Sequence, residues 1–193
     1  MKYGFDLDDT LTNTASVINK YAKRFDIEYL KGDGKFKIKK GYSRDYYYFA
    51  DALHWKKNDI RKFFEVYYEE ILKEVRIKSG VSDFLKYLKE NENDIFILTA
   101  RREKENGKIK KITEEWLNKR KIAYDKLFVG VKNKYELINQ YNIEVFVDDS
   151  YENCKSAIEL TNAKIYMLKN VYNKKIEDEY IVKIKRIEDI LSK

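Results

Sequence analysis

The sequence contains no proline, one cysteine and one histidine among its 193 residues. Without proline, no loop has a φ angle fixed by a ring, so the turns depend on seven glycines and on Asn, Asp and Ser. The single cysteine, Cys154, excludes an internal disulfide, fits a reducing compartment and is expected in the core. The one histidine, His54, lies in an aromatic-rich region and is expected to pack there rather than to transfer protons.

Long apolar runs are missing as well. A helix needs about 20 predominantly apolar residues to span a bilayer, and no uninterrupted run approaches that length. The first residues enter an apolar strand segment at once, so no signal peptide is expected. These absences predict a cytoplasmic protein without a membrane partner.

The charge balance is basic, with 40 Lys and Arg against 33 Asp and Glu and a net charge of +7. Such a surplus favours anionic partners, either nucleic acid or smaller anions such as nucleotides. The alternative is a lysine-rich amino-acid usage without meaning for partners. We favour this alternative because the lysines are spread along the chain rather than clustered.

Two apolar segments end in pairs of acidic residues. The first run leads into Asp6 and Asp8, and residues 143–147 lead into Asp148 and Asp149. A strand that ends in carboxylates places negative charge at the carboxyl edge of a sheet, where open α/β folds build their sites. Clustered carboxylates repel one another unless a cation or a proton compensates, and an all-oxygen cluster suits a hard ion such as Mg²⁺. The pattern therefore indicates Mg²⁺-dependent phosphoryl chemistry.

The rest of the apolar pattern alternates between strand and helix. Strands are expected at residues 3–7, 94–98, 127–131, 143–147 and 163–168, and helices at 13–25, 81–88, 109–117, 134–141, 151–162 and 186–191. Such alternation predicts an α/β fold with a parallel, doubly wound sheet. An aromatic-rich segment with helical spacing follows the first strand. We therefore expect a core formed by residues 1–12 and 79–193, with a small helical subdomain, residues 13–78, inserted after the first strand.

With these elements in place, the chain resembles the haloacid dehalogenase superfamily of phosphohydrolases, whose four motifs appear in order. The matching segments are Gly4-Phe5-Asp6-Leu7-Asp8-Asp9-Thr10, Ile95-Phe96-Ile97-Leu98-Thr99, Lys134 at the start of a helix, and Val145-Phe146-Val147-Asp148-Asp149. The resemblance implies a Rossmann-like core whose parallel sheet is flanked by helices. It also implies a small α-helical cap inserted after the first strand.

The resemblance further implies a role for each motif residue. Asp6 would be the nucleophile that forms an aspartyl-phosphate. Asp8 would protonate the leaving oxygen and then act as base for the attacking water. Thr99 and the backbone N–H of Ala100 would hold the phosphoryl oxygens, and Lys134 would neutralise charge on the nucleophile and the phosphate.

The implied cofactor is Mg²⁺. Asp148 would be a direct ligand, and Asp149 either a ligand through water or a partner of Lys134. Asp6 and the backbone carbonyl of Asp8 would complete the metal site.

Two further charged residues, Lys132 and Asp9, lie close to the motif residues in the sequence. Lys132 is an alternative to Lys134, which we favour because it follows Asn133, a suitable helix N-cap. Asp9 is expected to be hydrogen-bonded locally or solvated rather than catalytic.

Within the superfamily, the cap resembles that of the 5′(3′)-deoxyribonucleotidase-like branch, which includes type C cytosolic 5′-nucleotidases and related bacterial nucleotidases. Thr99-Ala100-Arg101 matches the second motif of the bacterial members, and Val147-Asp148-Asp149-Ser150 matches the last motif. The resemblance implies a small phosphorylated substrate, above all a nucleoside monophosphate.

The candidate substrate contacts are Arg101 and the cap aromatics Tyr46, Tyr47, Phe49 and Trp55, because aromatic rings can stack on any base. For each aromatic the alternative is packing within the cap, which we favour for any single residue. For Arg101 the alternatives are a position in the cap interface and a surface position.

Three functions compete on these residues. The leading prediction is a Mg²⁺-dependent phosphomonoester hydrolase that acts as a 5′-nucleotidase. The second keeps the chemistry and changes the substrate to a sugar phosphate or a nucleic-acid 3′-phosphate. The third, a non-catalytic binding protein with this fold, is less favoured because every motif acid is present.

Overall fold

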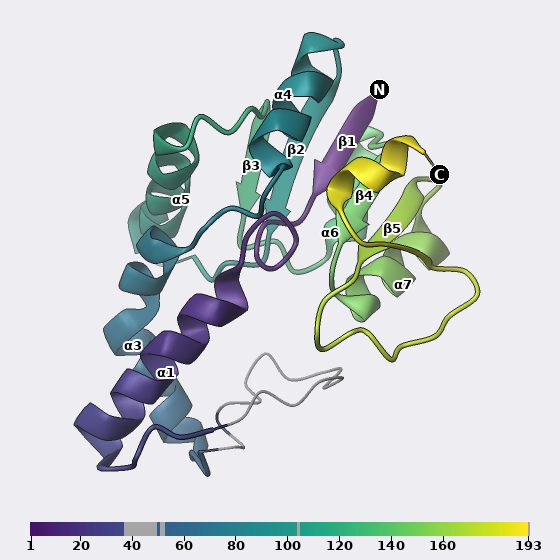
Figure 1. The fold of residues 1–193 in the computed structure, drawn as a ribbon. Helices are drawn as coiled ribbons and strands as arrows, with labels where there is room; N and C mark the ends of the chain where they lie inside the picture. Colours follow the sequence, from purple (N-terminus) through teal and green to yellow (C-terminus); the bar gives the residue numbers. More distant parts are fainter. Residues whose placement is uncertain (37–49, 51–52, 104, 193) are drawn as a thin grey trace.

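The structure is a computed structural model that describes residues 1–36, 50, 53–103 and 105–192 (Figure 1). Among these residues, six strands form one parallel sheet in the order β3-β2-β1-β4-β5-β6. The strands are β1 (Lys2–Phe5), β2 (Asp94–Thr99), β3 (Lys126–Val129), β4 (Val145–Asp148), β5 (Lys164–Leu168) and β6 (Val182–Ile184). The helices are α1 (Thr14–Leu30), α3 (Lys57–Glu74), α4 (Val81–Glu90), α5 (Lys108–Lys119), α6 (Lys134–Tyr141) and α7 (Tyr151–Leu160), with short 3₁₀ turns η1 (Glu105–Gly107) and η2 (Ile187–Leu191). The predicted α/β fold with a parallel sheet is confirmed.

Helices cover both faces of the sheet, and successive strand residues point to opposite faces. Phe5, Ile97 and Val147 belong to a core cluster that includes the apolar sides of α4, α5 and η2. Phe146 and Met167 belong to a second cluster with the apolar sides of α6 and α7. Because both faces are buried, the strands are nearly continuous apolar runs, as parallel sheets require.

The helices α1 and α3 lie beside each other, beyond the carboxyl edge of the sheet (Figure 1). Their contact is aromatic: the ring of Phe25 lies 5.0 Å from that of Trp55 and 5.6 Å from that of Phe63. We call α1 and α3 the cap helices. Aromatic pairs at such separations add to the free energy of simple burial, which explains why the region holds so many rings.

Helix α3 also rests on helix α5 of the core. The buried side chains of Leu72, Ile109 and Ile112 form an apolar cluster between the two helices. Beside this cluster, Lys108 Nζ lies 2.7 Å from Glu69 Oε1. The cap helices are therefore attached to the core along one side.

The chain passes between the sheet and the cap helices at two paired segments. Thr12 and Ile77 form an antiparallel bridge. On either side of it, the Lys78 N–H donates to Leu11 O at 2.9 Å and the Asn13 N–H to Arg76 O at 2.8 Å. These contacts lie beside residues 13 and 78, the predicted limits of the cap, and the division into two domains stays a prediction.

Several details differ from the sequence-based expectations. Strand β6 was not predicted, and the helix expected at residues 186–191 is the 3₁₀ turn η2. His54 is exposed with a φ of 58°, so the prediction that it packs is wrong. Cys154 is fully buried, as predicted. Among the described residues, no helix is both long enough and apolar enough to cross a membrane.

Candidate active site

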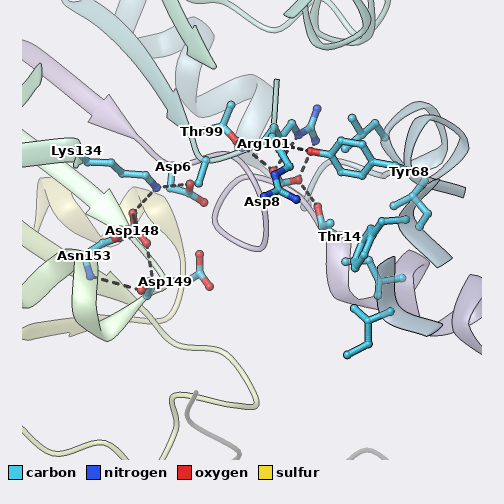
Figure 2. A pocket seen from close by; sticks show the side chains of 18 of the residues that line it. Asp6, Asp8, Thr14, Tyr68, Thr99, Arg101, Lys134, Asp148, Asp149 and Asn153 are labelled. Atoms are coloured by element: carbon cyan, nitrogen blue, oxygen red, sulfur yellow. Dashed lines mark hydrogen bonds and ion pairs between the residues drawn. The ribbon is translucent and has the colours of Figure 1, made fainter. Parts of the chain in front are cut away.

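The predicted site residues meet at the carboxyl edge of the sheet. Asp6 directly follows β1, Thr99 ends β2, Asp148 ends β4, and Lys134 is the first residue of α6 (Figure 2). The hydrogen bonding between β1 and β4 fixes the position of Asp6, because the Asp6 N–H donates to Val147 O at 2.9 Å. Parallel pairing therefore brings together residues that lie far apart in the sequence.

Lys134 joins two of the carboxylates. Its ammonium group donates to Asp6 Oδ1 and, at 2.6 Å, to Asp148 Oδ2. The side chain is only 3% exposed. Burial alone would lower the pKa of Lys134, but the two carboxylates outweigh burial and raise it, so the residue stays cationic. The competitor Lys132 is exposed.

Asp148 is held by a full set of donors. Besides Lys134, the Ser150 N–H donates to its Oδ1 at 2.8 Å and Asn153 Nδ2 to its Oδ2 at 3.0 Å. Ser150 is also the N-cap of α7, where its hydroxyl accepts from the N–H of Asn153. The start of α7 thus orients the acid that ends β4.

Asp6, Asp148 and Asp149 form a buried acidic cluster in which one ligand atom from each residue lies within 4.8 Å of the others. Burial is the largest influence on Asp6, and with Asp148 and Asp8 it raises the pKa to about 7 despite the attraction of Lys134. Burial and the carboxylates of Asp6 and Asp148 likewise raise the pKa of Asp149 well above its ordinary value. Three buried acids facing one bonded lysine leave excess negative charge, and their oxygen donors fit a hard divalent cation.

Asp8 lies beside this cluster in a different environment. Arg101 grips it with two hydrogen bonds of 2.8 Å, from Nε to Oδ2 and from Nη2 to Oδ1. The hydroxyls of Thr14 and Thr99 donate to the same carboxylate at 2.7 and 3.2 Å. Burial alone would raise the pKa of Asp8, but the charge and hydrogen bonds of Arg101 outweigh burial and lower it. The two acids of the first motif therefore differ in charge environment: the pKa of Asp6 is raised, and that of Asp8 is lowered.

A second group of polar side chains donates to backbone carbonyls in the loops that follow β1 and β4. Asn170 Nδ2 donates to Asp9 O at 2.8 Å, and the ammonium group of Lys78 donates to the same carbonyl. Asn173 Nδ2 donates to Asp149 O at 2.8 Å. Asp9 itself is buried and accepts from the Ala15 N–H at 2.9 Å, so the prediction of a local hydrogen-bonding role is confirmed.

A pocket of about 920 Å³ opens from these acids toward the cap helices. Asp6, Asp8 and Asp148 line one end of it, as do the predicted phosphate contacts Thr99 and Ala100. The opposite wall comes from the cap helices. Its apolar residues are Ile18, Ile60, Phe64, Tyr68, Ile71 and Leu72, and the charged side chains of Lys57, Arg61 and Glu65 also line it. With a divalent cation held at the acidic end, the pocket would suit a ligand with one anionic and one apolar part.

The sequence matches a known family. The sequence profile of the haloacid dehalogenase-like hydrolases matches residues 4–115. The chain belongs to this family. It is therefore an enzyme of the hydrolase class, and its sheet is the Rossmann-like core of the haloacid dehalogenase fold.

Individual relatives agree with this assignment. A Clostridium acetobutylicum protein named as a nucleotidase is 28% identical over 147 residues, which cover 75% of this chain and 72% of the relative. A haloacid dehalogenase-like hydrolase of Streptococcus pneumoniae superposes with a TM-score of 0.66 at 13% identity, covering 100% of this chain and 97% of that chain. A predicted phosphoglycolate phosphatase of Haemophilus somnus gives a TM-score of 0.67 at 17% identity, with 98% and 96% covered. At these identities the solved structures show a shared fold only.

The hydrolase pocket changes the list of candidate substrate contacts. Trp55 is packed between the cap helices, where its indole N–H donates to Asp26 Oδ1 at 2.9 Å, and it is not among the pocket-lining residues. Tyr46, Tyr47 and Phe49 lie outside the described residues. The aromatic side chains that do line the described pocket are Phe64 and Tyr68 on α3.

Sequence reasoning missed Phe64, Tyr68 and the support from Asn170 and Asn173. Phe64 and Tyr68 lie four residues apart on α3, which places them on one helical face and was the available signal. Asn170 and Asn173 follow the strand β5, and polar residues just after a parallel strand lie at the same edge as the site. The sequence does not show that β5 pairs with β4, and this pairing is what brings Asn170 and Asn173 to the site.

Proposed function

We propose that this hydrolase is a Mg²⁺-dependent phosphomonoesterase that works through an aspartyl-phosphate on Asp6. The observation that carries the proposal is the arrangement of Asp6: buried, bonded to Lys134, and clustered with Asp148 and Asp149 at the charged end of the pocket. When bound, Mg²⁺ would neutralise charge on the phosphoryl group and orient it. Asp6, Asp148 and Asp149, with the backbone carbonyl of Asp8, are the residues that would hold it.

The chain's own residues support both half-reactions. An oxygen of Asp6 attacks phosphorus, and the bond from phosphorus to the ester oxygen breaks with its electron pair leaving on that oxygen, which takes a proton from Asp8. In the second step a water oxygen attacks the phosphorus of phospho-Asp6. Its proton goes to Asp8, and the electron pair of the broken bond returns to Asp6. Lys134 balances the negative charge between nucleophile and phosphate throughout.

The substrate we propose is a nucleoside monophosphate. A volume of about 920 Å³ exceeds what a phosphate alone fills, so the site has room for a large leaving group. Phe64 and Tyr68 offer aromatic surface to that group, and their rings lie 6.0 Å apart. Base–aromatic stacking is tolerant of sequence, so the wall favours nucleosides without selecting one base. The nucleotidase name of the Clostridium acetobutylicum relative supports the same choice.

Phosphate release measured across a substrate panel tests this proposal. The panel contains ribo- and deoxyribonucleoside monophosphates, sugar phosphates and 3′-phosphorylated oligonucleotides, each with Mg²⁺ and with EDTA. We expect turnover concentrated on nucleotides, lost in EDTA and lost in Asp6→Asn. Turnover concentrated on sugar phosphates or oligonucleotides would keep the chemistry and refute the nucleotidase assignment.

A matched variant controls for the loss of a carboxylate. Asp125 accepts the Ile95 N–H at 2.7 Å, at the opposite, amino edge of the sheet, so Asp125→Asn should retain turnover. Metal binding is measured separately by calorimetry with Mg²⁺. Asp148→Asn should weaken binding, and unchanged affinity in this variant would refute the metal assignment even if activity were lost.

A further inference from the structure

Arg101 lines the pocket and was predicted as a substrate contact, but the hydrogen bonds of its side chain go to the protein. Nε and Nη2 form a bidentate hydrogen bond with the Asp8 carboxylate, from Nε to Oδ2 and from Nη2 to Oδ1, both at 2.8 Å. The third nitrogen, Nη1, donates to Thr113 Oγ1 at 3.1 Å. Each nitrogen of the guanidinium is thus engaged with the protein, and the side chain is only 1% exposed.

The support behind Arg101 is buried and hydrogen-bonded. Thr113 is fully buried on α5, and its own hydroxyl donates to Ile109 O at 2.8 Å, so the oxygen faces Arg101 as an acceptor. Ile109 belongs to the apolar cluster between α3 and α5. The guanidinium plane is therefore held from the helix side, and its other two nitrogens, Nε and Nη2, donate to Asp8.

The phosphate end of the site already has a cation. Lys134 bonds Asp6 directly, whereas Arg101 bonds the acid two residues later. Figure 2 shows the two cations on opposite sides of the loop after β1, Lys134 beside Asp6 and Arg101 beside Asp8. The backbone N–H of Arg101 donates to Thr99 Oγ1 at 3.2 Å, which ties the same residue to the second motif.

We propose that Arg101 is a positioning residue that acts on the reaction through Asp8 and does not bind the phosphate of the substrate. Its planar guanidinium group fixes the orientation of the Asp8 carboxylate relative to the leaving group and to water. Lysine cannot replace this function, because a single ammonium does not reproduce a bidentate geometry. The inference rests on the proposed phosphatase function, in which Asp8 is the acid and base.

The test compares Arg101→Met and Arg101→Lys with Asp8→Asn, the double variant Asp8→Asn/Arg101→Met, and Arg24→Met. Arg24 is the matched control because it also bonds a carboxylate, Glu28 Oε1 at 2.8 Å, but on the exposed surface of α1. Each protein is assayed for kcat and KM with p-nitrophenyl phosphate and with the best substrate of the panel. The inhibition constant of inorganic phosphate reports binding at the site independently of chemistry.

A positioning role predicts a loss of kcat without a loss of phosphate affinity. We expect Arg101→Met to lower kcat by about 10²–10⁴-fold, the usual contribution of a general acid or base. KM and the phosphate inhibition constant should stay within about threefold, the pattern of an interaction made only in the transition state. Arg101→Lys should lose nearly as much, and the double variant should be no slower than Asp8→Asn by more than about threefold, since residues that act as a unit are not additive. Arg24→Met should match the wild type.

Opposite outcomes overturn the inference. If Arg101 bound phosphate, Arg101→Met would raise KM and the phosphate inhibition constant at least tenfold, Arg101→Lys would restore activity, and the losses in the double variant would add. Thr113→Val provides a second variant if Arg101→Met fails to fold, because valine matches the shape of threonine and removes the hydroxyl that orients Nη1. It should lower kcat with KM unchanged, and a wild-type kcat would count against the inference. Absence of turnover in the wild type would instead refute the proposed function.

Discussion

Replacing Asp149 with asparagine should make the metal-free protein more stable. Asp149 is buried and shares the acidic cluster with Asp6 and Asp148, which raise its pKa well above the ordinary value of 3.8. The carboxyl group ionises more readily in the unfolded chain than in the folded one, so folding costs about 1.36 kcal/mol for each unit by which the pKa is raised. Asparagine removes this cost and can still accept the hydrogen bond that Thr10 donates at 2.7 Å.

The assay is thermal unfolding in EDTA and in Mg²⁺. For a chain of this length, each kcal/mol shifts Tm by roughly 2–4 °C, so Asp149→Asn should raise Tm in EDTA by several degrees. Because the folded pKa of Asp149 is raised, the wild type loses stability as the pH rises above 3.8, and the difference between the two proteins should shrink as the pH falls toward that value. In Mg²⁺ at about 100 times Kd the wild type should gain about 2.7 kcal/mol, and the variant less.

Two results would refute this reasoning. One is a lower Tm for Asp149→Asn than for the wild type in EDTA at pH 7. The other is an equal response of the two proteins to Mg²⁺. Asp125→Asn, which removes a carboxylate that accepts useful hydrogen bonds, should lower Tm and leave the response to Mg²⁺ unchanged.

Three further predictions concern single side chains. Lys134→Met should destabilise the metal-free protein by about 3–5 kcal/mol in denaturant titration, because it leaves buried carboxylates unpaired; the exposed Lys132→Met should have little effect. Trp55→Phe should cost about 1–3 kcal/mol by the same measurement, since it deprives the buried Asp26 of a donor, and a neutral result would contradict the packing described for the cap helices. Titration of tyrosinate absorbance should show Tyr67 ionising near pH 12, because burial and a glutamate acceptor raise the pKa to about 12, and the associated stability should be lost as the pH rises from 10 toward 12.

Much of the site could be predicted because it depends on strand ends. Asp6, Thr99 and Asp148 each follow an apolar run, and parallel strands bring their carboxyl ends to one edge whatever the details of packing. Lys134 could be placed because it opens a helix that follows a strand of the same sheet. These inferences need only local patterns and the topology.

The parts that could not be predicted depend on how elements dock. Which aromatic side chains face the pocket is decided by the packing of α1 on α3, which buries Trp55 and leaves Phe64 in the wall. The grip of Arg101 on Asp8 depends on the position of α5, which carries Thr113. Strand β6, three residues long, carries too short a pattern to be distinguished from a loop.

The bridge between Thr12 and Ile77 brings together the two points where the chain leaves the sheet for the cap helices and returns from them. Antiparallel partners have Cα atoms only about 4.5–5.5 Å apart, so a short turn could join these two residues without moving the sheet. Everything between them is an excursion that begins and ends at nearly the same point in space. An insert of different length between these two residues should therefore leave the carboxyl edge of the sheet unchanged while it changes the residues that face the pocket.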